Sequence, residues 1–257
     1  MPEDAATLHA ASHNDPHWRE RTDLAAAFRW AVRYDLHEAV ANHFSLAVNE
    51  DGTQFLLNPK KHFARIRASD LLLIDADDPE TMNRPDAPDP TAWGLHGALH
   101  RGCKRARCAL HLHSHYATVL ASLADSRLPA IDQNSALFFD RVVIDEGYGG
   151  MAFEEEGARV CGLFNAAPKA TIMVMGNHGV MAIGETVGQA FDRMYYFERA
   201  ARNVITAYMT GKPLRTLPDA VAEKVAQELE DYPSDLVESH LGELKAILDQ
   251  EGSDYAS

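Results

Sequence analysis

Apolar residues along the chain recur at two different spacings, and the wider spacing predicts helices. In several segments they return every three or four positions, which is typical of a helix that packs by one face. The first of these segments follows Asp15-Pro16, which favours a helix start because proline fits the first helical position. Helices are therefore predicted over residues 16–40, 91–100, 114–123, 154–165, 186–209, 218–231 and 235–249.

Shorter apolar runs, bounded by polar residues or glycine, predict β-strands. Asp51-Gly52 lies between the first two runs and favours a tight hairpin turn, because glycine accepts the positive φ that such a turn needs. Strands are predicted over residues 44–48, 54–57, 71–74, 107–113, 142–144, 171–175 and 180–183. This mixture of elements predicts an α/β or α+β fold.

The chain divides into segments of different character. Residues 1–20 are polar, without sustained periodicity, and are interpreted as a flexible leader. Residues 21–210 hold all the predicted strands and are expected to form the main domain, and residues 211–257 are expected to be a helical extension packed on it. Residues 75–90 are acidic and proline-rich and predict a loop, whose length suggests that it covers a site or an interface.

Charge and cysteine content narrow the classes of partner and compartment. The net charge is −14, from 38 acidic and 24 basic residues, which argues against nucleic acid and anionic membrane as partners. No apolar run approaches the length of a transmembrane helix, and the N-terminus lacks the pattern of a signal peptide. The three cysteines form no C-x-x-C pair, which favours a reduced, cytoplasmic protein, although a Cys103–Cys108 bridge is possible.

The histidine pattern predicts a divalent-metal site. His111 and His113 are two residues apart on a predicted strand, so both imidazoles point to the same side. His178 lies in the short loop Gly176-Asn177-His178-Gly179, where the glycines let the backbone bring a third ring in. Three such ligands suit Zn²⁺ and leave a position open for substrate or water. On spacing alone, a metal site and a chance pairing among 13 histidines are about equally supported.

Neighbouring polar residues allow more than one interpretation. His115 would join the metal face as a fourth ligand or an acid–base group if the strand continued, but would turn aside if Ser114 began a helix. Asn177 is expected to shape the loop or to contact substrate. Glu198 is expected to meet Arg202 one helical turn further on.

The order of these motifs resembles the class II aldolase/adducin family. The resemblance is carried by NHFSLAV at 42–48, FLLNPKKHFARIRASDLLLID at 55–75, WGLHGALHRGCKRARCALHLHSHYATVLA at 93–121, MGNHGVMAIG at 175–184 and AFDRMYYFERAARNVITA at 190–207. It implies a three-layer αβα sandwich with a mostly antiparallel central sheet. It also implies a homotetramer with sites near subunit boundaries, and a metal bound by His111, His113 and His178. That metal is usually Zn²⁺, and Mn²⁺ or Fe²⁺ would also suit three imidazoles.

Four further residues are candidates for the predicted site. His96 and His100 are one helical turn apart and could bind a metal, but His96 falls at the family's helix histidine, which favours packing or a hydrogen bond to a ligand. Glu146 and Tyr148 follow a strand and are candidates to approach the metal of a neighbouring subunit.

Two departures from the family pattern change the expected chemistry. Ala92 stands where the sugar-phosphate aldolases have a glutamate acid–base group. Asn42-His43 and Lys60-Lys61 replace the glycines of the phosphate-binding loops, which argues against phosphorylated ketoses. Both departures resemble the adducin-like branch of the family.

Together these observations favour a metal-dependent carbon–carbon lyase, of aldolase or decarboxylase type, acting on a small carbonyl or hydroxy-carboxylate compound. The absent glutamate favours decarboxylation, because loss of CO₂ needs an electron sink but no base at the breaking bond. His43 and Asn177 are the candidate substrate contacts, and His115 is the candidate acid–base residue. The alternative is a non-catalytic, adducin-like binding or structural protein, although the C-terminus DQEGSDYAS has no counterpart of adducin's lysine-rich tail.

Overall fold

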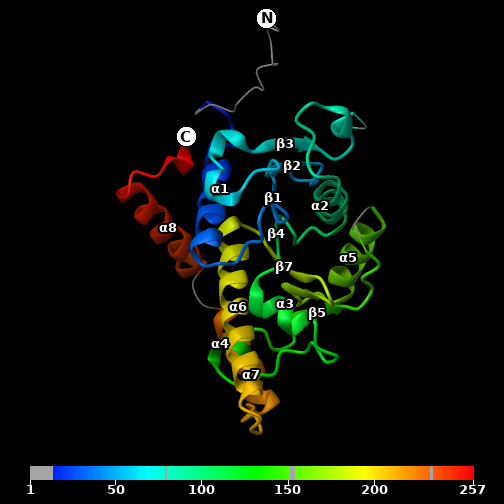
Figure 1. Cartoon of the computed structure of the whole chain (residues 1–257), viewed down its shortest axis with the longest axis vertical. Helices are drawn as coiled ribbons and strands as arrows, with labels where there is room; N and C mark the ends of the chain where they lie inside the picture. Colours follow the sequence, from blue (N-terminus) through cyan, green and yellow to red (C-terminus); the bar gives the residue numbers. More distant parts are fainter. Residues whose placement is uncertain (1–13, 79, 151–153, 232–233) are drawn as a thin grey trace, which may run out of the picture.

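The computed structural model describes residues 14–78, 80–150, 154–231 and 234–257, and its centre is one seven-stranded sheet (Figure 1). The strand order is β3-β2-β1-β4-β7-β6-β5, and every pairing is antiparallel except that of β5 with β6. The strands are β1 (His43–Ala47), β2 (Gln54–Leu57), β3 (Leu72–Asp75), β4 (Cys108–Leu112), β5 (Val142–Asp145), β6 (Ile172–Met175) and β7 (Gly179–Gly184).

Helices cover both faces of the sheet. In Figure 1, α2 and α5 lie on one side of the strands, and α1 and α6 lie on the other. The helices are α1 (Trp18–Arg33), α2 (Pro90–Gly102), α3 (His115–Ala121), α4 (Gln133–Ala136), α5 (Glu154–Ala166), α6 (Val187–Met209), α7 (Asp219–Glu230) and α8 (Ser234–Gln250). The predicted three-layer αβα sandwich with a mostly antiparallel sheet is therefore confirmed.

The pleat of the central strands decides which residues meet which helix layer. Leu110 and Leu112 of β4 pack in the core cluster formed with α1 and α6, whereas Ala109 packs in a second cluster with residues of α2 and α5. His111 is two residues beyond Ala109 and so shares the face covered by α2 and α5. His43 lies opposite His111 in the pairing of β1 with β4, on the same face.

The first helix ends earlier than the apolar pattern predicted, at Arg33 instead of near residue 40. Asp35 takes the left-handed conformation with φ 56°, and the Leu36 N–H donates to the Ala31 carbonyl at 2.8 Å. This is the Schellman arrangement that terminates many helices, with the apolar residue after the turn buried. The pattern concealed it because the left-handed residue is an aspartate and not a glycine.

The C-terminal residues pack on the same helix layer as α1 and α6. The α8 helix contacts both of these helices, and the Trp30 indole N–H donates to the Leu244 carbonyl at 2.9 Å. Arg141, whose side chain is buried beside β5, forms ion pairs of 2.7 Å with Glu223 and 3.0 Å with Glu230 of α7. These contacts tie the segment after α6 to the rest of the fold.

Two further sequence expectations concern cysteines and membrane helices. Cys103, Cys108 and Cys161 are all free, so the possible Cys103–Cys108 bridge does not form. Within the described residues, no helix combines the length and the apolar composition that crossing a membrane requires.

Candidate metal centre

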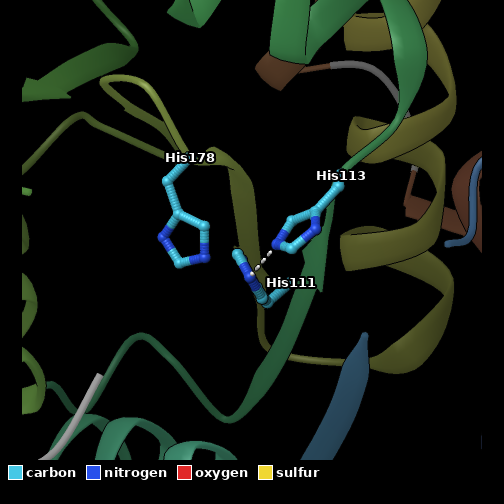
Figure 2. Close-up of side chains that lie close together, drawn as sticks. All are labelled: His111, His113 and His178. Carbon is cyan, nitrogen blue, oxygen red and sulfur yellow. Dashed lines mark hydrogen bonds between the residues drawn. The ribbon is translucent and has the colours of Figure 1, made fainter. Parts of the chain in front are cut away.

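The structure brings together the three histidines that the sequence singled out. His111 lies near the end of β4, His113 follows that strand, and His178 belongs to the loop between β6 and β7. One nitrogen from each ring lies within 4.8 Å of the others, and Figure 2 shows the three rings facing a common centre. The His111 and His113 Nε2 atoms are 3.1 Å apart, close to the roughly 3.3 Å that two imidazoles adopt on a tetrahedral zinc ion.

The loop that carries His178 is held close to β4 by its backbone. Asn177 has φ 57°, and its N–H donates to the Ala121 carbonyl at 2.9 Å. Gly179 leaves no room for a side chain: a Cβ there would lie 2.5 Å from the Leu112 carbonyl oxygen and 2.8 Å from a ring carbon of His113. The glycine after His178 is thus needed for close approach of the two segments.

An oxygen atom lies near the outer nitrogen of each imidazole. The His111 Nδ1 is 3.2 Å from the Val180 carbonyl, and the His113 Nδ1 is 2.5 Å from a Glu38 carboxylate oxygen. The His178 Nδ1 is 3.7 Å from a carboxylate oxygen of Glu156. The contacts of His111 and His113 are hydrogen bonds, which fix a ring's orientation and tautomer and leave Nε2 free as a metal ligand.

Burial keeps the His111 and His178 imidazoles neutral. Removal from water, reinforced by the neighbouring histidines, holds the pKa of His111 well below its usual value. Burial and the nearby His113 lower the pKa of His178 to about 4. A neutral imidazole offers the lone pair that a metal requires, so protons compete weakly for the site at neutral pH.

Two buried polar atoms at this site lack a hydrogen-bond partner among the described residues: the His178 Nδ1 and one carboxylate oxygen of Glu156. Burial raises the pKa of Glu156, against the opposing effect of Arg159. Unpaired buried polar atoms are costly, and they are expected where a bound ion or a tightened contact completes the site. The three imidazoles as a donor set fit a divalent metal ion of borderline softness.

A cavity of about 190 Å³ opens on the three imidazoles. His43, Asp89, Thr91 and Tyr148 also line it. The Tyr148 ring is centred 5.2 Å from the His178 ring, so this tyrosine lies at the candidate site of its own chain. The expectation that it approaches a neighbour's metal is not needed to explain its position.

A second cavity, of about 450 Å³, also borders His113 and His178 and is lined by Glu38 and His115 as well. His115 is exposed and begins α3, so the strand does not continue through it. The fourth-ligand alternative is not supported, because His115 is absent from the histidine cluster found among the described residues. An acid–base role at the cavity mouth stays a prediction.

The structure also shows where Ala92 and the remaining predicted residues lie. Ala92 is buried in an apolar cluster with Phe55 and Ile74 and does not line the cavity on the imidazoles. Asp89, three residues earlier, is the carboxylate that does line it. Asn177 is exposed and lines neither cavity, so its contact with substrate stays a prediction.

Glu198 has a different role from the one its spacing suggested. It is buried and accepts hydrogen bonds from the Tyr116 and Ala117 N–H groups, each at 2.9 Å, and from the Ser114 hydroxyl at 2.7 Å. A carboxylate from α6 therefore caps α3, directly after the metal-site strand. Arg202 instead lies over the ring of Tyr116.

The sequence analysis did not predict three carboxylates of the site: Glu38, Asp89 and Glu156. Glu38 reaches His113 only because the chain turns back after α1. Glu156 was visible only as one of three glutamates at a helix start, where a favourable interaction with the helix dipole was explanation enough. Asp89 caps the start of α2 and carried no further signal.

Comparison with known proteins places this architecture among class II aldolases and adducins. Residues 22–205 match the family model of the class II aldolase and adducin N-terminal domain. An aldolase II superfamily protein from Pseudomonas syringae, whose structure is solved, is 27% identical with a TM-score of 0.82 and coverage of 95% of this chain and 97% of that one. Decarboxylase NovR of Streptomyces niveus is 26% identical over 208 residues, covering 80% of this chain and 75% of that protein. Beta-adducin of Rattus norvegicus is 25% identical over 190 residues, which are 73% of this chain but 26% of that protein.

Proposed function

Since the chain belongs to the class II aldolase and adducin family, we propose that it is a divalent-metal-dependent lyase that cleaves a carbon–carbon bond in a small carbonyl or hydroxy-carboxylate compound. The observation that carries the proposal is the convergence of three imidazoles beside a cavity large enough for a small molecule. The metal is Zn²⁺ in first place, with Mn²⁺ or Fe²⁺ as alternatives for the same donor set.

At the proposed site, some residues would bind the metal and others orient the residues that bind it. His111, His113 and His178 would hold the metal, which supplies Lewis-acid polarisation of a substrate oxygen. Glu38 and the Val180 carbonyl keep two of these rings turned so that Nε2 faces the centre. The open side of the cluster faces the smaller cavity, where a substrate of a few carbon atoms fits.

The cavity favours decarboxylation over reversal of an aldol addition. Burial raises the pKa of Asp89, but hydrogen bonds from Thr91 outweigh it and hold that pKa below its usual value. Asp89 is therefore a carboxylate at neutral pH and a weak proton acceptor. Loss of CO₂ needs no base at the breaking bond, and a relative in the family is named as a decarboxylase.

Other parts of the proposal rest on the sequence resemblance. His43 and Asn177 are proposed as substrate contacts and His115 as an acid–base residue at the cavity mouth. A homotetramer in the cytoplasm is proposed for the assembly and its compartment. The similarity to beta-adducin supports one alternative, a non-catalytic binding protein that keeps the fold.

Metal content and chelator sensitivity test the proposal together. Protein purified without added metal should carry about one divalent ion per chain, and it should turn over 2-hydroxy- or 2-oxo-carboxylates only in the absence of chelator. His113→Ala should lose both properties. His240→Gln, on α8 beside Asp192, is the matched control and should keep them. A metal-free protein of full stability that turns over none of these compounds would favour the non-catalytic alternative. Turnover unaffected by chelator would instead contradict the metal dependence.

A further inference from the structure

A chain of hydrogen bonds runs from the smaller cavity into the core between β1 and α2. The His43 Nδ1 is 2.7 Å from the His96 Nε2, and the Ser45 hydroxyl contacts the His96 Nδ1 at 2.5 Å. The same hydroxyl is 2.6 Å from the His100 Nε2, and the His100 Nδ1 is 2.7 Å from the Ala106 carbonyl oxygen. Both His96 and His100 lie on α2 and are buried.

The Ala106 carbonyl, at the inner end of this series of hydrogen bonds, determines which group donates in each of them. A carbonyl oxygen only accepts, so the His100 Nδ1 must carry a proton and donate to Ala106. Burial lowers the pKa of His100 to about 4, so the ring is neutral and its Nε2 can only accept. The Ser45 hydroxyl therefore donates its single proton to His100.

The same reasoning applies to the two hydrogen bonds nearer the cavity, those of Ser45 with His96 and of His96 with His43. With its proton committed, the Ser45 oxygen accepts from the His96 Nδ1–H. His96 is neutral because burial holds its pKa well below the usual value, so its Nε2 accepts from the His43 Nδ1–H. In its neutral form, His43 therefore carries its single proton on Nδ1 and has an unprotonated Nε2.

The position of His43 allows its Nε2 to accept a hydrogen bond from a molecule bound in the smaller cavity. The His43 ring is centred 4.9 Å from that of His111 and lines the cavity on the three imidazoles. Among the described residues, no hydrogen bond to the His43 Nε2 is present, and His43 does not belong to the metal-binding cluster. A lone pair is thus held beside the place where a substrate would meet the metal.

We propose that His43 selects substrates with a hydroxyl group next to the metal-bound oxygen, by accepting that hydroxyl's proton in a hydrogen bond at Nε2. The chain from Ala106 through His100, Ser45 and His96 is a positioning device that excludes the other tautomer. The inference rests on the proposed function for its metal site, and it deepens that function by naming hydroxy-carboxylates over oxo-carboxylates as the substrate class. An oxo group would face the nitrogen lone pair with lone pairs of its own.

The tautomer is measured directly by long-range ¹H–¹⁵N correlation of the histidine rings, in metal-free and zinc-loaded protein. The wild-type protein should carry the His43 proton on Nδ1. Ser45→Ala leaves every cavity side chain in place and should give a mixture of tautomers, whereas Ser45→Thr keeps the hydroxyl and should restore the single form. A proton on Nε2 in the wild type, or an unchanged tautomer in Ser45→Ala, would overturn the inference.

Selectivity is measured with glycolate and methoxyacetate on the zinc-loaded protein, because these probes differ in whether the same oxygen carries a proton. Glycolate should bind about ten-fold more tightly, the effect of one good hydrogen bond. The preference should shrink in Ser45→Ala and vanish in His43→Phe, with zinc affinity kept in both variants. Equal preference in His43→Phe and wild type refutes the selection. If the protein binds no zinc, the proposed function fails, and the tautomer of the metal-free protein alone decides this inference.

Discussion

Glu38 shows how one exposed carboxylate supports a buried ligand. Its side chain is 61% exposed, and it contacts His113 at the rim of the larger cavity. An exposed hydrogen bond of this kind contributes little to folding stability. Its value lies in orientation, because it holds the proton of His113 on Nδ1 and leaves Nε2 for the metal.

Removing this carboxylate should therefore weaken metal binding more than stability. Glu38→Ala is expected to lower zinc affinity by about 10- to 100-fold, as losses of such supporting groups do. Glu38→Gln retains an oxygen acceptor and should lie between Glu38→Ala and the wild type. Zinc affinity is measured by competition with a chromophoric chelator, with Glu50→Gln as the exposed control. Equal affinities in all four proteins would show that Glu38 does not orient the ligand.

At the scale of secondary-structure elements, the close approach of the β6–β7 loop to β4 depends on Gly179. A methyl group there would meet the Leu112 carbonyl, which belongs to the sheet and cannot move freely. Gly179→Ala should destabilise the fold by about 1–3 kcal/mol and displace His178, with loss of zinc binding. Urea unfolding and metal titration measure the two effects.

Gly162→Ala is the matched control for that substitution. Gly162 lies in α5, and a Cβ there would meet no atom within 4 Å. This variant should gain up to about 1 kcal/mol from helix propensity and should bind zinc normally. If Gly179→Ala were equally harmless, the loop would not depend on close packing against β4.

A second element-scale prediction concerns the cap of α3. Glu198→Ala leaves the Tyr116 and Ala117 N–H groups and the Ser114 hydroxyl without their buried acceptor, at a cost of about 2–3 kcal/mol. Arg202→Ala removes only a cation–ring contact and should cost less than about 1 kcal/mol. Thermal or urea unfolding decides between them. Equal losses of stability in the two variants would instead support the Glu198–Arg202 pair that the helical spacing suggested.

At the scale of the whole molecule, buried neutral histidines make stability depend on pH. His100 titrates at a pKa of about 4 in the fold, against about 6.5 in an unfolded chain. Between these values the unfolded state binds the extra proton, so the free energy of unfolding falls as pH falls. Each such histidine contributes about 1.4 kcal/mol per pH unit across its window.

The metal-free protein should accordingly lose stability between pH 6.5 and pH 5. Urea unfolding at several pH values measures the slope. His100→Gln should make that slope shallower, whereas His115→Gln replaces an exposed histidine and should run parallel to the wild type. A wild-type stability that stayed constant over this range would mean that the buried histidines have the same pKa in the folded and the unfolded state.

The parts of this molecule that a sequence reveals are those set by local periodicity. The pairing of His111 with His113 follows from the two-residue repeat of one strand, and most elements follow from apolar spacing in the same way. Glu38 acts through a contact across 75 residues and Glu198 through contacts across 81 to 84 residues, so no local pattern contains them. The replacement of a glutamate at Ala92 was visible, but the neighbouring Asp89 needed the three-dimensional course of α2.

The antiparallel pairing of β4 with β7 also has a kinetic consequence. Ligands at positions 113 and 178 come together only when two strands distant in sequence have paired, and such long-range contacts form late in folding. Zinc at this site would therefore slow unfolding and leave the refolding rate nearly unchanged. Chevron plots with and without zinc should therefore differ in the unfolding limb and coincide in the refolding limb, because the ion binds only after the strands have paired.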